Sequence, residues 1–315
     1  MSLTDEEREQ GEARSRMLRL HTSPGHLIRR AHQVHTALWT EEFDGEVTGP
    51  QYALLSVLAS GSMDQRSAGQ SASLDKSTAA DVVARLARHG WLARRRDAGD
   101  RRRYLLSLTT PARSALRHIT PRVAAVQRRF LEPLSPDESA WFSAVLARVA
   151  FRGEPPAVPE DADASFVLLP ATAPGHLLRR SEQLQGVYWA QHVGSLLTSP
   201  QYALLTAVAW NDDIDQSTAG ELASLDKSST TDVIARLARR GLVTARPDPR
   251  DRRRKLIDLT AEAREVVERV AVAAELVQRD LLAPLRADEV TRFVSLLEVL
   301  AYRRPLLRAE HPLSD

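Results

Sequence analysis

The chain has 315 residues, contains no cysteine, and balances 43 lysines and arginines against 41 aspartates and glutamates. This length suits two domains that each bury a core, and the lack of cysteine excludes disulfides, cysteine metal sites and thiol catalysis. Because the formal net charge is only +2, a basic surface that binds phosphates has to be a local patch.

The sequence gives no sign of a membrane or export segment. No apolar run approaches the roughly 20 residues that cross a bilayer. Residues 1–21 are charged throughout and lack the apolar stretch of a signal peptide. We therefore expect a cytoplasmic protein with no membrane partner.

In chain order, a polar arm over residues 1–22 comes first and a series of helical patterns follows. Apolar residues at helical spacing, and capping boxes such as Thr48-Gly49-Pro50-Gln51, predict helices. The predicted helices span residues 23–43, 48–60, 66–73, 75–89, 111–132 and 136–150. Two short strands are expected at 91–95 and 103–109, on either side of an arginine-rich turn.

The predicted helix over residues 75–89 carries the strongest functional signal. Asp75 is placed to cap its first turn, and Gly90 is placed to end it in a left-handed conformation. The exposed start offers Lys76, Ser77 and Thr78 as hydrogen-bond donors. A helix with such a start, followed by a basic hairpin, is typical of a protein that reads DNA.

The whole pattern occurs twice in the chain. Pro24 returns as Pro174, an offset of 150 positions (174 − 24), and Asp75 returns as Asp226, an offset of 151 (226 − 75). A period of this length indicates duplicated domains rather than a solenoid. We therefore predict an arm at 1–22, a first repeat at 23–150, a proline-rich linker at 151–172, a second repeat at 173–305 and a tail at 306–315.

The order of helix, helix, helix-turn-helix, basic wing and two long helices resembles the MarR family of winged-helix transcription regulators. The resemblance rests on Leu74-Asp75-Lys76-Ser77-Thr78, Leu86-Ala87-Arg88-His89-Gly90 and Asp100-Arg101-Arg102, and on the matching segments 225–228, 237–243 and 251–253. It implies a mainly α fold with small β-wings, in which two winged helix-turn-helix domains share a helical core like that of family homodimers. The chain is then a monomeric pseudo-dimer, a repressor that reads a pseudo-palindromic operator in double-stranded DNA.

The helix starts and the wings hold the candidate DNA contacts. They are Lys76, Ser77, Thr78, Ala80, Asp81, Arg101 and Arg102 in the first copy, and Lys227, Ser228, Ser229, Thr231, Asp232, Arg252 and Arg253 in the second. By resemblance, Arg102 and Arg253 enter a minor groove and are oriented by Asp100 and Asp251. The alternatives are ordinary helix N-terminal chemistry at the helix starts, solvated hairpins for the wings, and, for the two aspartates of the helices, ion pairs of Asp81 with Arg85 and of Asp232 with Arg236.

The two copies differ at positions that matter for reading DNA. Three aligned pairs in the first turns of the recognition helices differ, namely Thr78 and Ser229, Ala79 and Thr230, and Ala80 and Thr231. We expect all three pairs to face bases, so the two half-sites should be unequal. In addition, Ser71 stands where the second copy has Leu222, and we expect this change to weaken packing below the first recognition helix.

An effector site is expected by resemblance, because family members often hold an anionic or aromatic ligand between the dimer helices and the winged domain. The candidates to line two such clefts are His26, Trp39 and Tyr52 for one, and His176, Tyr188, Trp189 and Tyr202 for the other. The alternative is that these residues are core aromatics and hydrogen-bonded histidines. No metal or cofactor is expected, because the pair His32 and His35 becomes Glu182 and Gln185 in the second copy.

We expect no enzymatic activity, because the sequence has no glycine-rich phosphate loop, no His-Glu-x-x-His motif and no Gly-x-Ser-x-Gly motif. The alternative function is a protein-interaction scaffold whose winged domains have lost DNA affinity. Sequence-specific DNA binding distinguishes the two.

Overall fold

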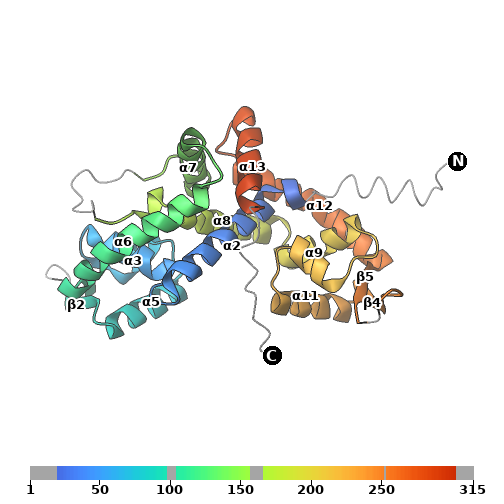
Figure 1. Cartoon of the computed structure of the whole chain (residues 1–315), viewed down its shortest axis with the longest axis horizontal. Coiled ribbons are helices and arrows are strands. Elements are labelled where there is room, and N and C mark those ends of the chain that lie inside the picture. Colours follow the sequence, from blue (N-terminus) through green and yellow to red (C-terminus); the bar gives the residue numbers. More distant parts are fainter. Residues whose placement is uncertain (1–19, 98–103, 157–165, 252, 303–315) are drawn as a thin grey trace, which may run out of the picture. The chain divides into compact units, whose positions relative to one another are not determined.

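The structure is a computed structural model that describes residues 20–97, 104–156, 166–251 and 253–302 (Figure 1). The first part of the chain contains η1 (Leu20–Thr22), α2 (Pro24–Phe43), α3 (Gly49–Ala59), β1 (Met63–Asp64), α4 (Gln65–Ser71), α5 (Lys76–Arg88), β2 (Leu92–Arg96), β3 (Tyr104–Leu108), α6 (Thr110–Leu131) and α7 (Pro136–Phe151). The second part contains η2 (Pro170–Thr172), α8 (Pro174–His192), α9 (Ser199–Trp210), α10 (Gln216–Leu222), α11 (Lys227–Arg239), β4 (Val243–Pro247), β5 (Lys255–Leu259), α12 (Ala261–Leu282) and α13 (Ala287–Ala301). Across these described ranges, no helix has both the length and the apolar character that crossing a bilayer requires.

The helices and wing strands predicted for the first repeat are confirmed, with small differences at their ends. The first capping box is formed, because the Thr48 hydroxyl accepts the amide of Gln51 and the Gln51 side chain accepts the amide of Thr48. The short strand β1 was not predicted; its Met63 pairs with Leu106 of β3. A strand of two residues is too short to show the alternation that predicts a strand.

The compact units of the molecule are not the two repeats. Unit 1 combines residues 1–30 with 182–298, and unit 2 combines residues 31–181 with 299–315, each with the gaps given above. Helix α2 therefore starts in unit 1 and continues in unit 2, whereas α8 starts in unit 2 and continues in unit 1. Each winged helix-turn-helix domain is thus completed by the start of the other repeat's first helix.

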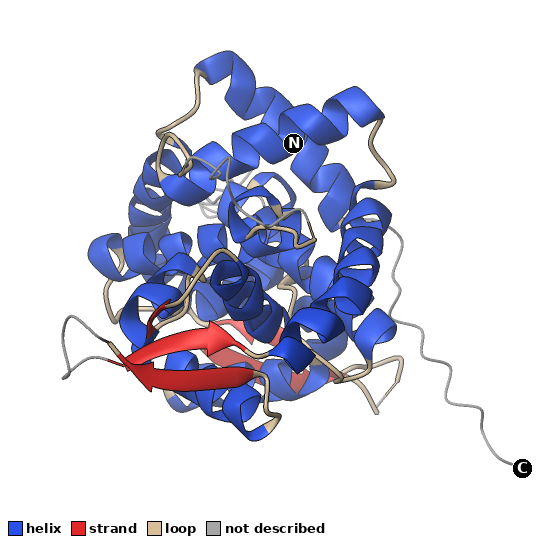
Figure 2. Cartoon of the chain, turned by 90° about the vertical axis from the view of Figure 1, so that its left-hand side faces the viewer, coloured by secondary structure: helices blue, strands red, loops and turns tan. Residues whose placement is uncertain are grey.

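In unit 2, α3 lies at the centre of the core, and every residue from Gln51 to Ala59 is buried. Helix α6 packs on α3 and buries a stripe at the predicted helical spacing, formed by Leu116, Ile119, Val123, Val126 and Phe130. Burial of one such side chain stabilises the fold by about 1.5–3 kcal/mol. The strands form an antiparallel sheet in the order β1-β3-β2, drawn in red among the blue helices in Figure 2.

Unit 1 repeats this plan with the second set of elements. Residues Gln201 to Ala209 of α9 are all buried, and α12 packs on α9 with the buried stripe Val267, Val270, Ala274, Val277 and Leu281. Strands β4 and β5 form a two-stranded antiparallel hairpin. A single bridge between Asp215 and Leu256 takes the place of the short strand β1.

One expectation about the helix-turn-helix is wrong. Ser71 is exposed, and its counterpart Leu222 is 37% exposed, so this position lies outside the core in both domains. The next residues, Ala72 and Ala223, are completely buried and are the same in both copies. Packing below α5 is therefore not weakened by Ser71.

Candidate DNA-binding surface and ligand cavity

The start of α5 is built on the carboxylate of Asp75. This carboxylate accepts the backbone amides of Ser77 and Thr78, each at 2.9 Å, and both of their hydroxyls at 2.5 Å. These hydrogen bonds, of which the one from the Ser77 hydroxyl has the largest effect, hold the pKa of Asp75 well below its usual range. Since the hydroxyl hydrogens point inward, Ser77 and Thr78 present oxygen lone pairs, which suit the amino group of a cytosine or adenine. Lys76 is exposed beside them.

The start of α11 is also capped by an aspartate, Asp226, but a different hydroxyl donates to it. Asp226 accepts the amide of Ser229 at 2.8 Å and its hydroxyl at 2.9 Å. The expectation that Thr230 faces a base is wrong, because Thr230 is only 3% exposed and its hydroxyl donates to the carbonyl of Asp226 at 2.7 Å. Its counterpart Ala79 is also buried. Both positions pack against a glycine of the preceding helix, Gly69 or Gly220.

The remaining candidates on the two recognition helices are on the surface. Ala80, Asp81, Lys227, Ser228, Thr231 and Asp232 are all exposed. The hydroxyl of Thr231 donates to the carbonyl of Lys227 at 2.9 Å and accepts from Gln216 at 3.2 Å. Among the residues described, no ion pair joins Asp81 to Arg85 or Asp232 to Arg236. The two aspartates therefore keep accessible carboxylates on the surface that the prediction assigns to base contact.

The first wing carries arginines braced by an aromatic ring. The residues of β2 from Ala93 to Arg96 are exposed. The guanidinium of Arg94 lies 4.3 Å from the ring centroid of Tyr104, and Arg96 donates to the Tyr104 hydroxyl at 3.4 Å. Such cation–π contacts limit the side-chain freedom of an arginine without cancelling its charge. The predicted wing residues Asp100, Arg101 and Arg102 lie outside the described residues.

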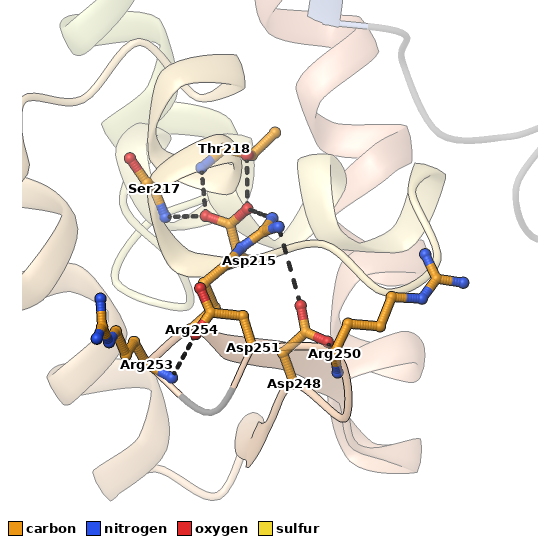
Figure 3. Close-up of polar contacts among 8 residues, drawn as sticks. All are labelled: Asp215, Ser217, Thr218, Asp248, Arg250, Asp251, Arg253 and Arg254. Carbon is orange, nitrogen blue, oxygen red and sulfur yellow. Dashed lines mark hydrogen bonds and ion pairs between the residues drawn. The ribbon is translucent and has the colours of Figure 1, made fainter.

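The second wing is held by an ion-pair network that the sequence pattern does not predict (Figure 3). Arg254 pairs with Asp215, the N-cap of α10, and also lies 3.9 Å from Asp248. Asp215 accepts the amides of Ser217 and Thr218 at 2.8 and 3.1 Å. Burial raises the pKa of Asp215, but the hydrogen bonds from Thr218 and Arg254 outweigh burial and bring the pKa to about 2. The base of this wing is thereby tied to the first helix of the helix-turn-helix.

The tip of the second wing leaves its arginines in solvent. Asp251 accepts the backbone amide of Arg253 at 3.0 Å, and Asp248 accepts that of Arg250 at 2.8 Å. These aspartates shape the turn, as aspartates often do, so Asp251 acts on Arg253 through the backbone. The exposed side chains of Arg250 and Arg253 point in opposite directions (Figure 3). Arg252 lies outside the described residues.

Unit 2 contains a cavity of about 390 Å³. Its lining includes the predicted residues Trp39, Tyr52 and His176, together with His32, His35 and Arg179. The predicted grouping of the histidines is wrong. His176 of the second repeat joins Trp39 and Tyr52, because the start of α8 belongs to unit 2, and His26 lies in unit 1. The predicted apolar end of the linker also reaches the cavity, where the amide of Leu168 donates to the Tyr52 hydroxyl at 2.8 Å.

Two lining histidines are held neutral. Burial lowers the pKa of His35 to about 3, and burial with the charge of Arg179 lowers that of His176 to about 3. Gln127 donates to His35 at 2.9 Å and accepts the amide of Gly175 at 3.0 Å. Arg179 donates to Nδ1 of His176 at 3.2 Å. The aromatic rings and the neutral imidazoles give the cavity a largely apolar wall.

Arg179 links the cavity to the helix-turn-helix. Its guanidinium donates to the carbonyls of Ala72 at 2.7 Å and Ser73 at 3.0 Å, in the turn between α4 and α5. Arg180 adds a hydrogen bond to the Ser73 hydroxyl at 2.8 Å. Ser73 has a left-handed backbone, with φ of 51°, which a residue other than glycine adopts only when its surroundings impose it. The position of α5 therefore depends on the residues that line the cavity.

Unit 1 has the equivalent arrangement with almost no free space. His26, Trp189 and Tyr202 line a cavity of about 20 Å³, whereas the buried Tyr188 is not part of its lining. Arg29 donates to the carbonyl of Ala223 at 2.7 Å. The start of α2 thus holds the turn before α11, as the start of α8 holds the turn before α5.

Comparison with known proteins gives the same family for both repeats. A model of the MarR family matches residues 46–103 and 197–254. The transcriptional regulator HosA of Escherichia coli O111:H- is 34% identical over 122 residues, which cover 39% of this chain and 90% of that protein. The HTH-type transcriptional repressor NicR of Pseudomonas putida is 27% identical over 124 residues, which cover 39% of this chain and 78% of that protein.

Similar solved structures also correspond to part of the chain. The PcaV transcriptional regulator from Streptomyces coelicolor, in complex with its natural ligand, is 40% identical and covers 44% of this chain and 99% of its own, with a TM-score of 0.42. BpsR of Bordetella bronchiseptica, described with regulation of its DNA binding by 6-hydroxynicotinic acid, is 30% identical and covers 40% of this chain and 91% of its own, with a TM-score of 0.39.

Proposed function

Because this chain belongs to the MarR family and is a DNA-binding transcriptional regulator, we propose that it represses as a single-chain pseudo-dimer, with α5 and α11 reading the two halves of one pseudo-palindromic operator. The observation that carries this proposal is that the chain has two reading heads, where a reading head is a recognition helix with the wing that follows it. Each copy has an exposed recognition helix with a lysine at its start, followed by a basic hairpin. Dimeric helix-turn-helix proteins read half-sites about one helical turn apart, roughly 34 Å. A covalent link supplies both heads without a concentration-dependent step.

The exposed side chains support a division of labour in each head. Lys76 and Lys227 contact phosphates, while the hydroxyl oxygens and the carboxylates of Asp81 and Asp232 accept hydrogen bonds from base amino groups. Arg102 and Arg253 contact the minor groove. Since Ala79 and Thr230 are buried, the difference between the half-sites arises mainly from Ala80 and Thr231. One changed base contact shifts the preference by about 1–3 kcal/mol.

We also propose that a small aromatic acid releases the repressor by binding in the cavity of unit 2. The volume of about 390 Å³ and the walls of Trp39 and Tyr52 suit an aromatic ring. Arg179 suits a carboxylate. A carboxylate that binds Arg179 competes with the carbonyls of Ala72 and Ser73, so it weakens the support of α5. Effector binding and DNA binding are then coupled through a shared arginine.

Selection of bound sequences from a random DNA pool, followed by gel-shift titration at several salt concentrations, tests the DNA part of the proposal. We expect an enriched imperfect palindrome that binds at least 1,000-fold more tightly than random DNA, on the order of the usual specificity ratio. If no sequence is enriched, the chain is the protein-interaction scaffold considered above. Gel shifts with the selected site and aromatic carboxylates test the effector part, with benzamide as the uncharged control.

A further inference from the structure

We propose that the chain binds one effector molecule, in unit 2, so that only the recognition helix α5 is under effector control. This inference rests on the effector site proposed above and adds its stoichiometry and its target. It comes from comparing two cavities whose lining residues correspond position by position. The matched pairs are His176 and His26, Arg179 and Arg29, Trp39 and Trp189, Tyr52 and Tyr202, and Gln127 and Gln278.

The first difference between the cavities is their volume. The cavity of unit 2 measures about 390 Å³, which is in the range of small-molecule sites. That of unit 1 measures about 20 Å³, roughly the space of one water molecule. Larger side chains fill the wall of unit 1, where Ser199 stands in place of Gly49 and Leu20 stands in place of Pro170. An aromatic ring therefore fits in unit 2 and not in unit 1.

The second difference is charge. In unit 1, burial lowers the pKa of Arg29, and the nearby carboxylate of Glu182 acts in the opposite direction, so the chain supplies its own counter-charge. In unit 2 the position of Glu182 is occupied by His32, which lines the cavity. Burial and the charge of Arg180 lower the pKa of Arg179 to about 10. Over the described parts of the chain, no carboxylate forms an ion pair with Arg179. Its positive charge remains available to an anionic ligand.

Both differences favour unit 2 as the site for the aromatic acid. They also determine which recognition helix responds to the bound acid. Arg179 supports the turn before α5 through Ala72 and Ser73. Arg29 supports the turn before α11 through Ala223 and lies beside the cavity of only about 20 Å³. A bound aromatic acid therefore loosens α5 and leaves the support of α11 unchanged. The induced protein keeps one reading head on its half-site instead of losing both together.

Calorimetric titration of the full chain with benzoate, ring-substituted benzoates and cinnamate measures the stoichiometry directly. We expect one site per chain. His32→Glu places in unit 2 the counter-charge that unit 1 already has, and we expect it to weaken binding at least tenfold. His32→Gln changes the same side chain without adding charge, so its loss of ligand affinity should be at least fivefold smaller than that of His32→Glu. Glu182→Gln is the matched control in unit 1, and we expect it to leave both the stoichiometry and the Kd within twofold of the original chain.

Footprinting on the selected operator, with saturating ligand, tests the target of control. We expect protection to weaken at the half-site read by α5 and to persist at the one read by α11. Two sites per chain, a large effect of Glu182→Gln, or equal loss of both half-sites would overturn the inference and leave the effector proposal standing. If none of these carboxylates binds or releases DNA, the effector part of the proposed function fails, and the inference fails with it.

Discussion

Gly175→Ala tests whether the start of α8 is fixed inside unit 2. Gly175 is the second residue of α8, and its amide donates to Gln127 at 3.0 Å. A Cβ at this position falls inside van der Waals contact with three atoms of the His35 ring. The ring is buried and receives a hydrogen bond from Gln127 at 2.9 Å. It can move away only by giving up that bond.

The expected cost follows from three contributions. Overpacking a filled core costs about 1–3 kcal/mol, and a buried hydrogen bond left without its partner costs about 1–3 kcal/mol more. Replacing glycine by alanine in a helix returns about 0.5–1 kcal/mol. The lower halves of these ranges give a net destabilisation of about 2 kcal/mol, which lowers the melting temperature of unit 2 by about 4–8 °C.

Thermal melts followed by far-UV circular dichroism measure this effect, with two matched glycines as controls. Gly186 in the same helix has no atom within 4 Å of a new Cβ, so Gly186→Ala should stabilise the chain by about 0.5–1 kcal/mol. Gly25, the counterpart of Gly175, faces the flexible end of Gln185 instead of a ring, so Gly25→Ala should cost less than Gly175→Ala. If Gly175→Ala melts with or above these controls, His35 is not packed against the start of α8.

Three further predictions concern DNA binding and pH. Arg102→Ala and Arg253→Ala should each make the negative slope of log K against log salt shallower by about one. Arg246→Ala should change the slope less, because Asp258 already pairs with Arg246 at 2.8 Å. Equal slopes in all variants would mean that the wings are solvated hairpins. Exchanging Ala80 and Thr231 should reverse the orientation of the chain on an imperfect palindrome, as read by footprinting, and an unchanged orientation would show that neither residue reads bases. The histidines His35 and His176 have folded pKa values of about 3, below the usual 6.5. Their contribution to the stability of the fold is therefore complete above pH 6.5 and is lost as pH falls towards 3. Between pH 7 and 5 the free energy of unfolding, measured by urea titration, should fall by up to about 2 kcal/mol for each histidine. A free energy of unfolding independent of pH would mean that both rings are accessible to water in the fold.

The helices, the caps and the doubled architecture could be predicted from sequence because each depends on local patterns. The Asp75 cap and the Thr48 capping box are examples, since their residues lie within one helical turn. The same locality explains two errors. The sequence pattern predicts Thr230 on the face that reads DNA, whereas helical geometry turns it towards Gly220. The pattern also predicts Ser71 in the core, whereas it lies at the exposed end of a short helix.

The ligand cavity could be predicted only in part, because it depends on which copy completes which domain. The sequence shows two equivalent helix starts, but periodicity carries no information about whether His176 packs near Tyr52 or near Tyr202. The network of Arg254, Asp215 and Asp248 was missed for a similar reason, since its members lie on a wing and on a helix far apart in the chain. The difference in cavity size depends on single side chains, such as Gly49 and Ser199, whose effect appears only when the walls are assembled.

The exchange of helix starts has a consequence for how such a chain evolves. In a homodimer, one mutation alters both subunits, so a change that improves one half-site contact or one pocket is imposed on the other as well. Here each winged domain contains a segment encoded in the other half of the gene, so the two halves are inherited as a matched pair. A substitution at Glu182 is then tested by selection in one domain only. The two domains can therefore change separately, while the exchanged helix starts make each domain depend on both halves of the chain.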